Sequence, residues 1–314
     1  MVGLLSAMQG FVVIAIIIGT GYATARLNIG GPSAQMVLNR YAFFVTNPFL
    51  MFAILSKEPI ANIFNQSIVV AFFSAVATGA LFLLLNRLFF HMGPADATVG
   101  TLNSLYLNSN NIGLPIATYI LGNPTLVAPI LVMQQAIFAP IALTVLDYAA
   151  TGKISFKRAL GQLLRQPLLI GSLGGILVSV ISARTGFYPI PKFIYDPIYM
   201  IGQAAVPMIL MAFGMSLHGT RPMENKSSRP AVIAVTVLKN VVMPLIAFLI
   251  AFFIMEFRGK VLYACVVLAA LPAGQNVYNF AARYNVGTTF ARDGVLISTI
   301  TSPSVIALIA ALLD

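Results

Sequence analysis

Long apolar runs alternate with short polar or turn-rich breaks along the whole chain. A run of about 20 apolar residues is long enough to cross the hydrocarbon core of a membrane as a helix. The pattern therefore predicts ten membrane-spanning helices, near residues 4–25, 34–55, 66–90, 95–121, 124–149, 167–184, 196–217, 230–255, 260–284 and 289–312. None of the breaks between them is long enough for a soluble domain, so we expect the functional residues to lie within the membrane.

Composition supports an all-α integral membrane protein. Of the 314 residues, 59% are hydrophobic and 8% are charged, whereas a soluble domain carries about 25% charged residues. Such a chain cannot cover a surface that faces water, so the lipid bilayer is its expected surrounding. The basic residues behind the net charge of +10 are not clustered as in a nucleic-acid-binding surface, so no nucleic acid is expected as a partner.

Lysine and arginine residues indicate the orientation of the chain. With the N-terminus outside, the inside loops and helix ends hold eleven of these residues and the outside ones hold five. Lysine and arginine are enriched in cytoplasmic loops. We therefore expect a multi-pass protein of the cell inner (plasma) membrane, with both termini outside and a basic cytoplasmic linker at 150–166.

Two proline-containing spans recur at nearly the same offset. Pro48 and Pro207 are 159 residues apart, and Pro115 and Pro272 are 157 apart. Five spans per repeat is an odd number, so the second repeat must run inverted in the membrane. Such paired, interrupted spans indicate a transporter's binding site. The predicted domains are a first five-helix repeat (1–149), the linker (150–166) and a second, inverted five-helix repeat (167–314).

The fourth and ninth spans are predicted to be broken helices that cross. Proline lacks a backbone N–H and clashes with the preceding helical turn. In "LNSNNIGLPIATYILG" (107–122) we expect a break near 110–114, with Pro115 opening a second half-helix, and Pro272 doing the same in the ninth span. Broken backbone is tolerated inside a membrane only where it is buried in protein or lines a wet cavity.

Amide side chains at these breaks are the main candidates for a binding site. They supply partners to the broken backbone and face a ligand, while the half-helix ends offer partial charges of both signs. The alternative is that they only join kinked helices to their neighbours. The predicted substrate-binding residues are Asn108, Asn110, Asn111, Pro115, Lys239, Pro272, Gln275, Asn276 and Asn279.

Lys239 lies well inside the eighth span, where a lysine is costly unless it finds a partner. Two alternatives stay open. The side chain pairs with a substrate carboxylate, or it snorkels to the inner face or bonds a helix C-terminus.

The coupling ion, Na⁺ or H⁺, also stays open. The amides of Asn110, Asn111, Gln134 and Gln135 suit a hard cation, and they equally suit hydrogen bonds between helices. The sequence holds no metal-ligand cluster and no nucleotide-binding motif, so we expect neither a metal nor another cofactor. His218 is expected at a helix end, in contact with solvent.

Several segments resemble the auxin efflux carrier family of membrane transporters. They are "TNPFLMF" in the second span, "NxNNIGLP" in the fourth, "FGMSL" in the seventh and "LPAGQNVYNFAARY" in the ninth. The resemblance covers the whole chain and is greatest to bacterial members. It implies an inverted repeat similar to the bile acid–sodium symporter fold, with a scaffold domain from spans 1, 2, 6 and 7 and a transport domain from spans 3–5 and 8–10. It also implies a small organic anion such as malate or malonate as the substrate.

One departure from the family concerns proton coupling. Plant auxin carriers have a carboxylate in the third span, and here that span reads "SIVVAFFSAVATGALFLLL". This absence argues against coupling through a carboxylate in that span.

These observations favour a secondary active transporter or facilitated carrier of a small organic anion, a mono- or dicarboxylate, that works by alternating access. The alternative is a membrane sensor or receptor that binds the anion without transporting it, which would not need an inverted pair of broken helices. An enzyme is not expected, because the spans lack a buried nucleophile with its base and lack an acid pair. A homodimer is included among the expected assemblies.

Overall fold

The computed structural model describes residues 2–59, 66–151, 161, 166–219, 223 and 225–313, and this part of the chain is almost entirely helical. The α-helices are α1 (Val2–Arg26), α2 (Ala34–Tyr41), α3 (Asn47–Lys57), α5 (Ser67–Leu85), α6 (Pro94–Leu105), α7 (Leu114–Tyr119), α8 (Ala128–Met133), α9 (Ala139–Thr151), α11 (Pro167–Thr185), α12 (Lys192–Gln203), α13 (Ala205–Leu217), α14 (Arg229–Val237), α15 (Met243–Leu249), α16 (Gly259–Ala269), α17 (Gln275–Tyr284) and α18 (Thr288–Leu313).

Short π and 3-10 turns continue many of these helices. They are η1 (Ala42–Thr46), η2 (Asn86–Phe90), η3 (Ser109–Gly113), η4 (Pro124–Val127), η5 (Gln134–Phe138), η6 (Lys226–Ser228), η7 (Leu238–Val242) and η8 (Ile250–Ile254). The predicted linker at 150–166 lies largely outside the described residues.

Seven helical segments of the described chain are long and apolar enough to cross a membrane. They are Ala34–Lys57, Ser67–Phe90, Pro124–Ala149, Pro167–Thr185, Lys192–Leu217, Lys226–Ile254 and Thr288–Leu313. Many large apolar side chains on them are exposed, such as those of Leu84, Leu177 and Phe253, as a lipid-facing surface requires. The prediction of a helical, multi-pass membrane protein is therefore confirmed.

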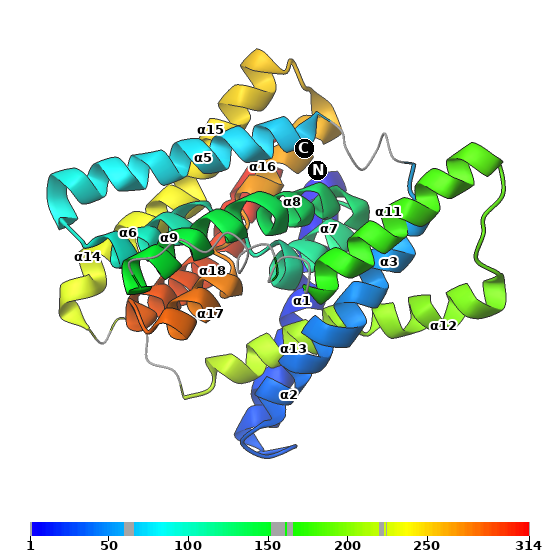
Figure 1. The fold of residues 1–314 in the computed structure, drawn as a ribbon, viewed down its shortest axis with the longest axis horizontal. Coiled ribbons are helices and arrows are strands. Elements are labelled where there is room, and N and C mark those ends of the chain that lie inside the picture. The colour runs from blue at the N-terminus through cyan, green and yellow to red at the C-terminus, as the bar shows by residue number, and fades with distance from the viewer. Residues whose placement is uncertain are drawn as a thin grey trace.

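The helices gather into two groups. In the first group α3 packs against α11 and α12, and α13 packs against α1 and α2. In the second group α5 packs against α6, α15 and α16, and α18 packs against α14, α16 and α17. Figure 1 shows α3, α11 and α12 on one side of the molecule and α6, α9, α14, α17 and α18 on the other.

Glycines allow the closest helix contacts of the first group. A Cβ atom on Gly21 of α1 would clash with the carbonyl oxygen of Met211 in α13, and one on Gly214 of α13 would clash with that of Ile18 in α1. The α3–α11 pair has the same kind of contact, because a Cβ atom on Gly171 would clash with the Pro48 carbonyl oxygen. Small residues are how membrane helices bring their backbones together. In two helix pairs of the first group, the backbones are thus in direct contact.

Candidate functional site

Two broken helices meet in the second group. The first is interrupted between α6 and η3, and the second between α16 and α17. Leu107 and Ala273 form an antiparallel bridge there. The Asn108 N–H donates to the Pro272 carbonyl at 2.8 Å, and the Gly274 N–H donates to the Tyr106 carbonyl at 2.8 Å. Each break thus supplies the backbone partners that the other lacks, which lipid cannot provide.

Both breaks lie at positions that differ from the predicted ones. The first helix ends at Leu105, earlier than the expected break at 110–114, and Pro115 is buried near the start of α7, behind the turn η3. Pro272 lies in the extended segment, whereas the second half-helix begins at Gln275. The expectation that Pro272 opens that half-helix is therefore wrong, because its carbonyl is used to pair with the other break.

Side chains complete the first break. The Asn108 side chain accepts from the Asn111 N–H at 3.2 Å and so caps η3. Gln134 is buried in η5, where its amide donates to the Leu107 carbonyl at 2.8 Å and accepts from the Ser109 hydroxyl at 2.7 Å. Gln134 therefore joins a neighbouring helix to the crossing, as the alternative interpretation of these amides expected.

Hydroxyl groups of α18 complete the second break. Ser298 Oγ accepts from the Ala273 N–H at 3.0 Å, and Ser302 Oγ donates to the Ala270 carbonyl at 2.8 Å. The Asn240 amide in turn donates to the Ser298 carbonyl at 2.8 Å. The backbone of both breaks is thereby tied to the helix beside it.

A cleft of about 750 Å³ lies between the two groups of helices and reaches the crossing. One wall comes from the end of α1, from α2 and from α13, including Gln35, Asn39 and Ser216. The other wall comes from η3, α17 and α18, where Asn111 and Gln275 line it. Two of the predicted binding residues, from the two breaks, therefore face one cleft.

The other predicted residues lie elsewhere. Asn108 and Pro115 are buried, and Asn279 is exposed, but none of them lines the cleft. Asn276 follows Gln275 in α17 and is partly exposed, also outside the cleft lining. Lys239 is completely buried in η7.

The predicted cation residues are brought together only in part. The Asn110 amide donates to Asn111 Oδ1 at 2.9 Å, and Gln134 is occupied with the first break. The side-chain oxygens of Asn110 and Gln135 are buried without a hydrogen-bond partner. Within the described ranges, no three His, Cys, Asp or Glu residues gather as metal ligands.

Charged residues at the cleft are cationic and were missed by sequence reasoning. The two arginines Arg26 and Arg292 line it, His218 lies there as well, and no Asp or Glu residue of the described ranges belongs to its lining. These three lie far apart in the sequence, and only their common place at helix ends near predicted inside loops hinted at a shared position. Arg26 thus brings a positive charge to the cleft, whereas Arg292 forms an ion pair with Asp293.

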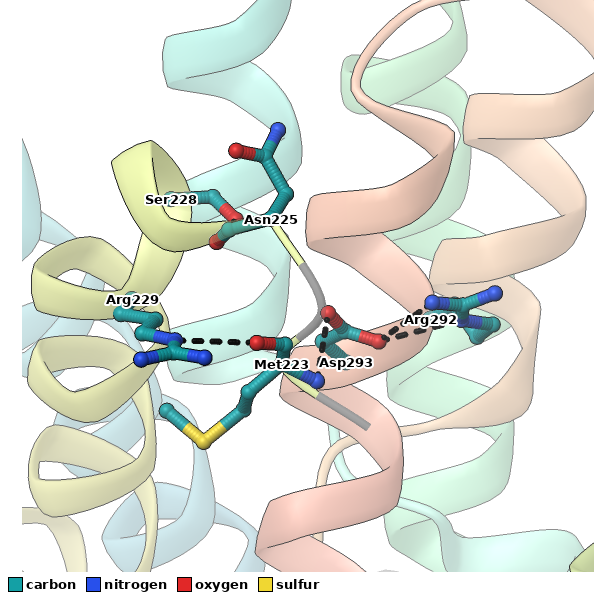
Figure 2. A network of polar contacts seen from close by, with 6 residues as sticks. All are labelled: Met223, Asn225, Ser228, Arg229, Arg292 and Asp293. Atoms are coloured by element: carbon teal, nitrogen blue, oxygen red, sulfur yellow. Dashed lines mark hydrogen bonds and ion pairs between the residues drawn. The ribbon is translucent and has the colours of Figure 1, made fainter. Parts of the chain in front are cut away.

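Asp293 holds Arg292 in place. Its side chain is completely buried, and its carboxylate pairs with the Arg292 guanidinium at 2.9 Å. The other carboxylate oxygen accepts from the Met223 N–H at 3.1 Å, and Arg229 Nε donates to the Met223 carbonyl at 2.9 Å (Figure 2). In the sequence Met223 lies between α13 of the first group and α14 of the second. Asp293 of α18 therefore attaches Met223 to the second group.

A second, small cavity of about 20 Å³ lies beside the crossing, and most of its lining is apolar, including Leu107, Leu126 and Leu268. That volume has room for about one water molecule. Next to the crossing, the described part of the chain therefore has a wide cleft and a cavity too small for a substrate.

Comparison with family models shows the family to which the chain belongs. A family model described as "Membrane transport protein" matches the chain twice, over residues 6–156 and 151–310. The chain belongs to the membrane transport protein family. This is the auxin efflux carrier-like family, so the resemblance seen in the sequence is confirmed. Members of this family are transporters and not enzymes.

Two relatives of this family member span nearly the whole chain. An uncharacterized transporter of Methanocaldococcus jannaschii is 23% identical over 304 residues, which cover 96% of this chain and 97% of that protein. A protein of Rhizobium meliloti named "Putative malonate transporter" is 26% identical over 296 residues, or 90% of this chain and 88% of that protein. Membership of this family implies a small-molecule substrate.

Proposed function

We propose that the protein is a secondary active transporter or facilitated carrier of a small organic anion, and that the cleft is its substrate pathway. The observation that carries the proposal is the composition of the cleft: amides from both breaks line it, and its charged side chains are cationic. An amide N–H group and an arginine both donate hydrogen bonds to a carboxylate. A mono- or dicarboxylate such as malate or malonate therefore suits the site.

Alternating access fits the division of the helices. We propose ten spans in two inverted repeats, 1–149 and 167–314, with spans 1, 2, 6 and 7 as a scaffold. The pairing of α1 with α13 and of α11 with α3 supports this, because an inverted repeat exchanges span 1 with 6 and span 2 with 7. The glycine contacts bring the backbones together within each of these two pairs, and we propose that the crossing moves against them.

Orientation completes the proposal. We place the protein in the cell inner membrane with both termini outside, as the distribution of basic residues favours. Arg26, His218 and Arg292 then lie on the cytoplasmic side, so we propose that the cleft opens toward the cytoplasm. We also propose that the protein forms a homodimer, which light scattering of the purified protein would test.

Counterflow in proteoliposomes tests the function. Vesicles loaded with unlabelled malonate or malate should accumulate the labelled anion only when they contain the protein. A sensor would bind the anion, seen as a rise in the unfolding temperature, without any counterflow. That result would replace transport by the sensing alternative. Vesicles loaded with an uncharged sugar provide the control.

A further inference from the structure

Lys239 is a completely buried lysine without an anionic partner in the described part of the chain. None of its surface is exposed, and no carboxylate contacts it in the described part of the chain. Its ammonium group donates to the Ala269 carbonyl at 2.9 Å and contacts the Met243 sulfur at 3.2 Å. An ionisable side chain buried inside a membrane protein is costly, so its retention indicates a specific task.

The acceptor of this bond lies at a particular place. Ala269 is the last residue of α16, the half-helix that ends at the second break. The C-terminal end of a helix carries a partial negative charge of about half an electron. Ala273, which bridges to the first break, follows four residues later. Lys239 therefore places its amino group at the negative helix end that points to the crossing.

The first break has a neutral group in the comparable role. There the Gln134 amide donates to the Leu107 carbonyl, and Gln134 comes from the helix beside the break. The second break uses serines for its backbone and adds a lysine for the helix end. The lysine is thus a feature of the second break alone, since a neutral amide suffices to satisfy the broken backbone of the first.

We propose that the ammonium group of Lys239 is a resident cation at the C-terminal end of α16, which takes the place of a dissociable coupling cation there. It offsets the negative helix end and keeps the crossing able to accept an anion in the cleft. This inference rests on the proposed function for the identity of the ligand, but its effect on the crossing can be measured without any anion.

Two substitutions separate charge from volume. Lys239→Met retains most of the side-chain volume and removes the charge, whereas Lys239→Ala leaves a space that propylammonium fits. Lys260→Met is the matched control, because Lys260 is exposed near the start of α16, the helix whose C-terminal end accepts the hydrogen bond of Lys239. Unfolding temperature in detergent and malonate affinity are measured for each variant and for the native protein.

We expect Lys239→Met to lower both quantities, with a loss of about tenfold or more in malonate affinity, and Lys260→Met to lower neither. Propylammonium should raise the unfolding temperature of Lys239→Ala and leave those of the native protein and Lys239→Met unchanged. Replacing choline chloride by NaCl at equal ionic strength should stabilise Lys239→Ala more than the native protein.

Native-like stability and affinity in Lys239→Met would overturn the proposal, because the lysine would then serve only as a space-filling group. Equal responses of the native protein and Lys239→Ala to propylammonium and Na⁺ would overturn it as well. If Lys239→Ala does not fold even with propylammonium, the comparison of Lys239→Met with Lys260→Met decides. A native protein that binds no carboxylate would instead refute the proposed function, while the unfolding temperatures still test the resident cation.

Discussion

The N–H of Asn108 and the carbonyl of Pro272 form a 2.8 Å hydrogen bond between two segments that are far apart in the chain. With the bond from Gly274 to Tyr106, it closes an antiparallel bridge in the middle of a helical protein. The bridge brings the amides of both broken helices to one cleft.

The cleft amides should bind the substrate. We expect Asn111→Ala and Gln275→Ala each to lower malonate affinity by about tenfold, because each loses a hydrogen bond to a charged ligand. Isothermal titration or thermal shift of the purified variants measures this. Gln203→Ala is the control, since Gln203 is exposed and lies outside the cleft lining. Unchanged affinity in both cleft variants would assign these amides to helix contacts only.

Gln134 should matter for stability more than for ligand affinity. Gln134→Ala removes the amide that donates to the Leu107 carbonyl and accepts from the Ser109 hydroxyl, and leaves these two groups only their long 3.4 Å hydrogen bond to each other. The expected cost is about 1–3 kcal/mol. Denaturant unfolding in detergent should show this loss. If malonate affinity falls while stability stays native, Gln134 contacts the ligand pathway and our structural assignment is wrong.

Glycine packing in the first group predicts opposite effects for two neighbouring substitutions. A Cβ atom on Gly21 would clash with the Met211 carbonyl, so Gly21→Ala should destabilise the protein. A Cβ atom on Gly19 of the same helix meets no atom within 4 Å, so Gly19→Ala should be neutral or stabilising by up to about 1 kcal/mol. Thermal unfolding compares them. Equal effects would show that α1 and α13 do not depend on this close approach.

Cysteine labelling should report the orientation. In a Cys265→Ala background, a membrane-impermeant maleimide added to intact cells should label Ala183→Cys and leave Ser33→Cys unlabelled. Both positions are exposed, at the end of α11 and before α2 respectively. Permeabilised cells should label both variants, which controls for reactivity. Labelling of position 33 alone in intact cells would reverse the proposed topology.

Much of the fold could be predicted because membrane helices are specified by local composition. Seven of the ten predicted apolar runs correspond to helical segments long and apolar enough to cross a membrane, and prolines with asparagines marked the interrupted segments near 107 and 273. The position of each break was harder to predict. Pro115 is compatible with the start of a helix, so the chain breaks where the partner segment around Pro272 offers hydrogen bonds instead. That partner lies in the other half of the chain and leaves no local signal.

The candidate site was also predicted only in part, because some of its residues leave no local signal in the sequence. Amides in an apolar run are conspicuous, so Asn111 and Gln275 were found. Arg26, His218 and Arg292 share the cleft only because α1, α13 and α18 pack around it. Nothing in the sequence pairs them, since no regular spacing connects them. The role of Lys239 likewise depends on a single carbonyl in another helix.

The bridge between Leu107 and Ala273 also bears on how the protein can be assembled. Each half of the chain carries an extended segment whose backbone groups are satisfied by the other half. Either half made alone would expose N–H and C=O groups at membrane depth and should be cleared as misfolded. Two separately expressed fragments, 1–151 and 166–314, should therefore accumulate only when a cell makes both of them together.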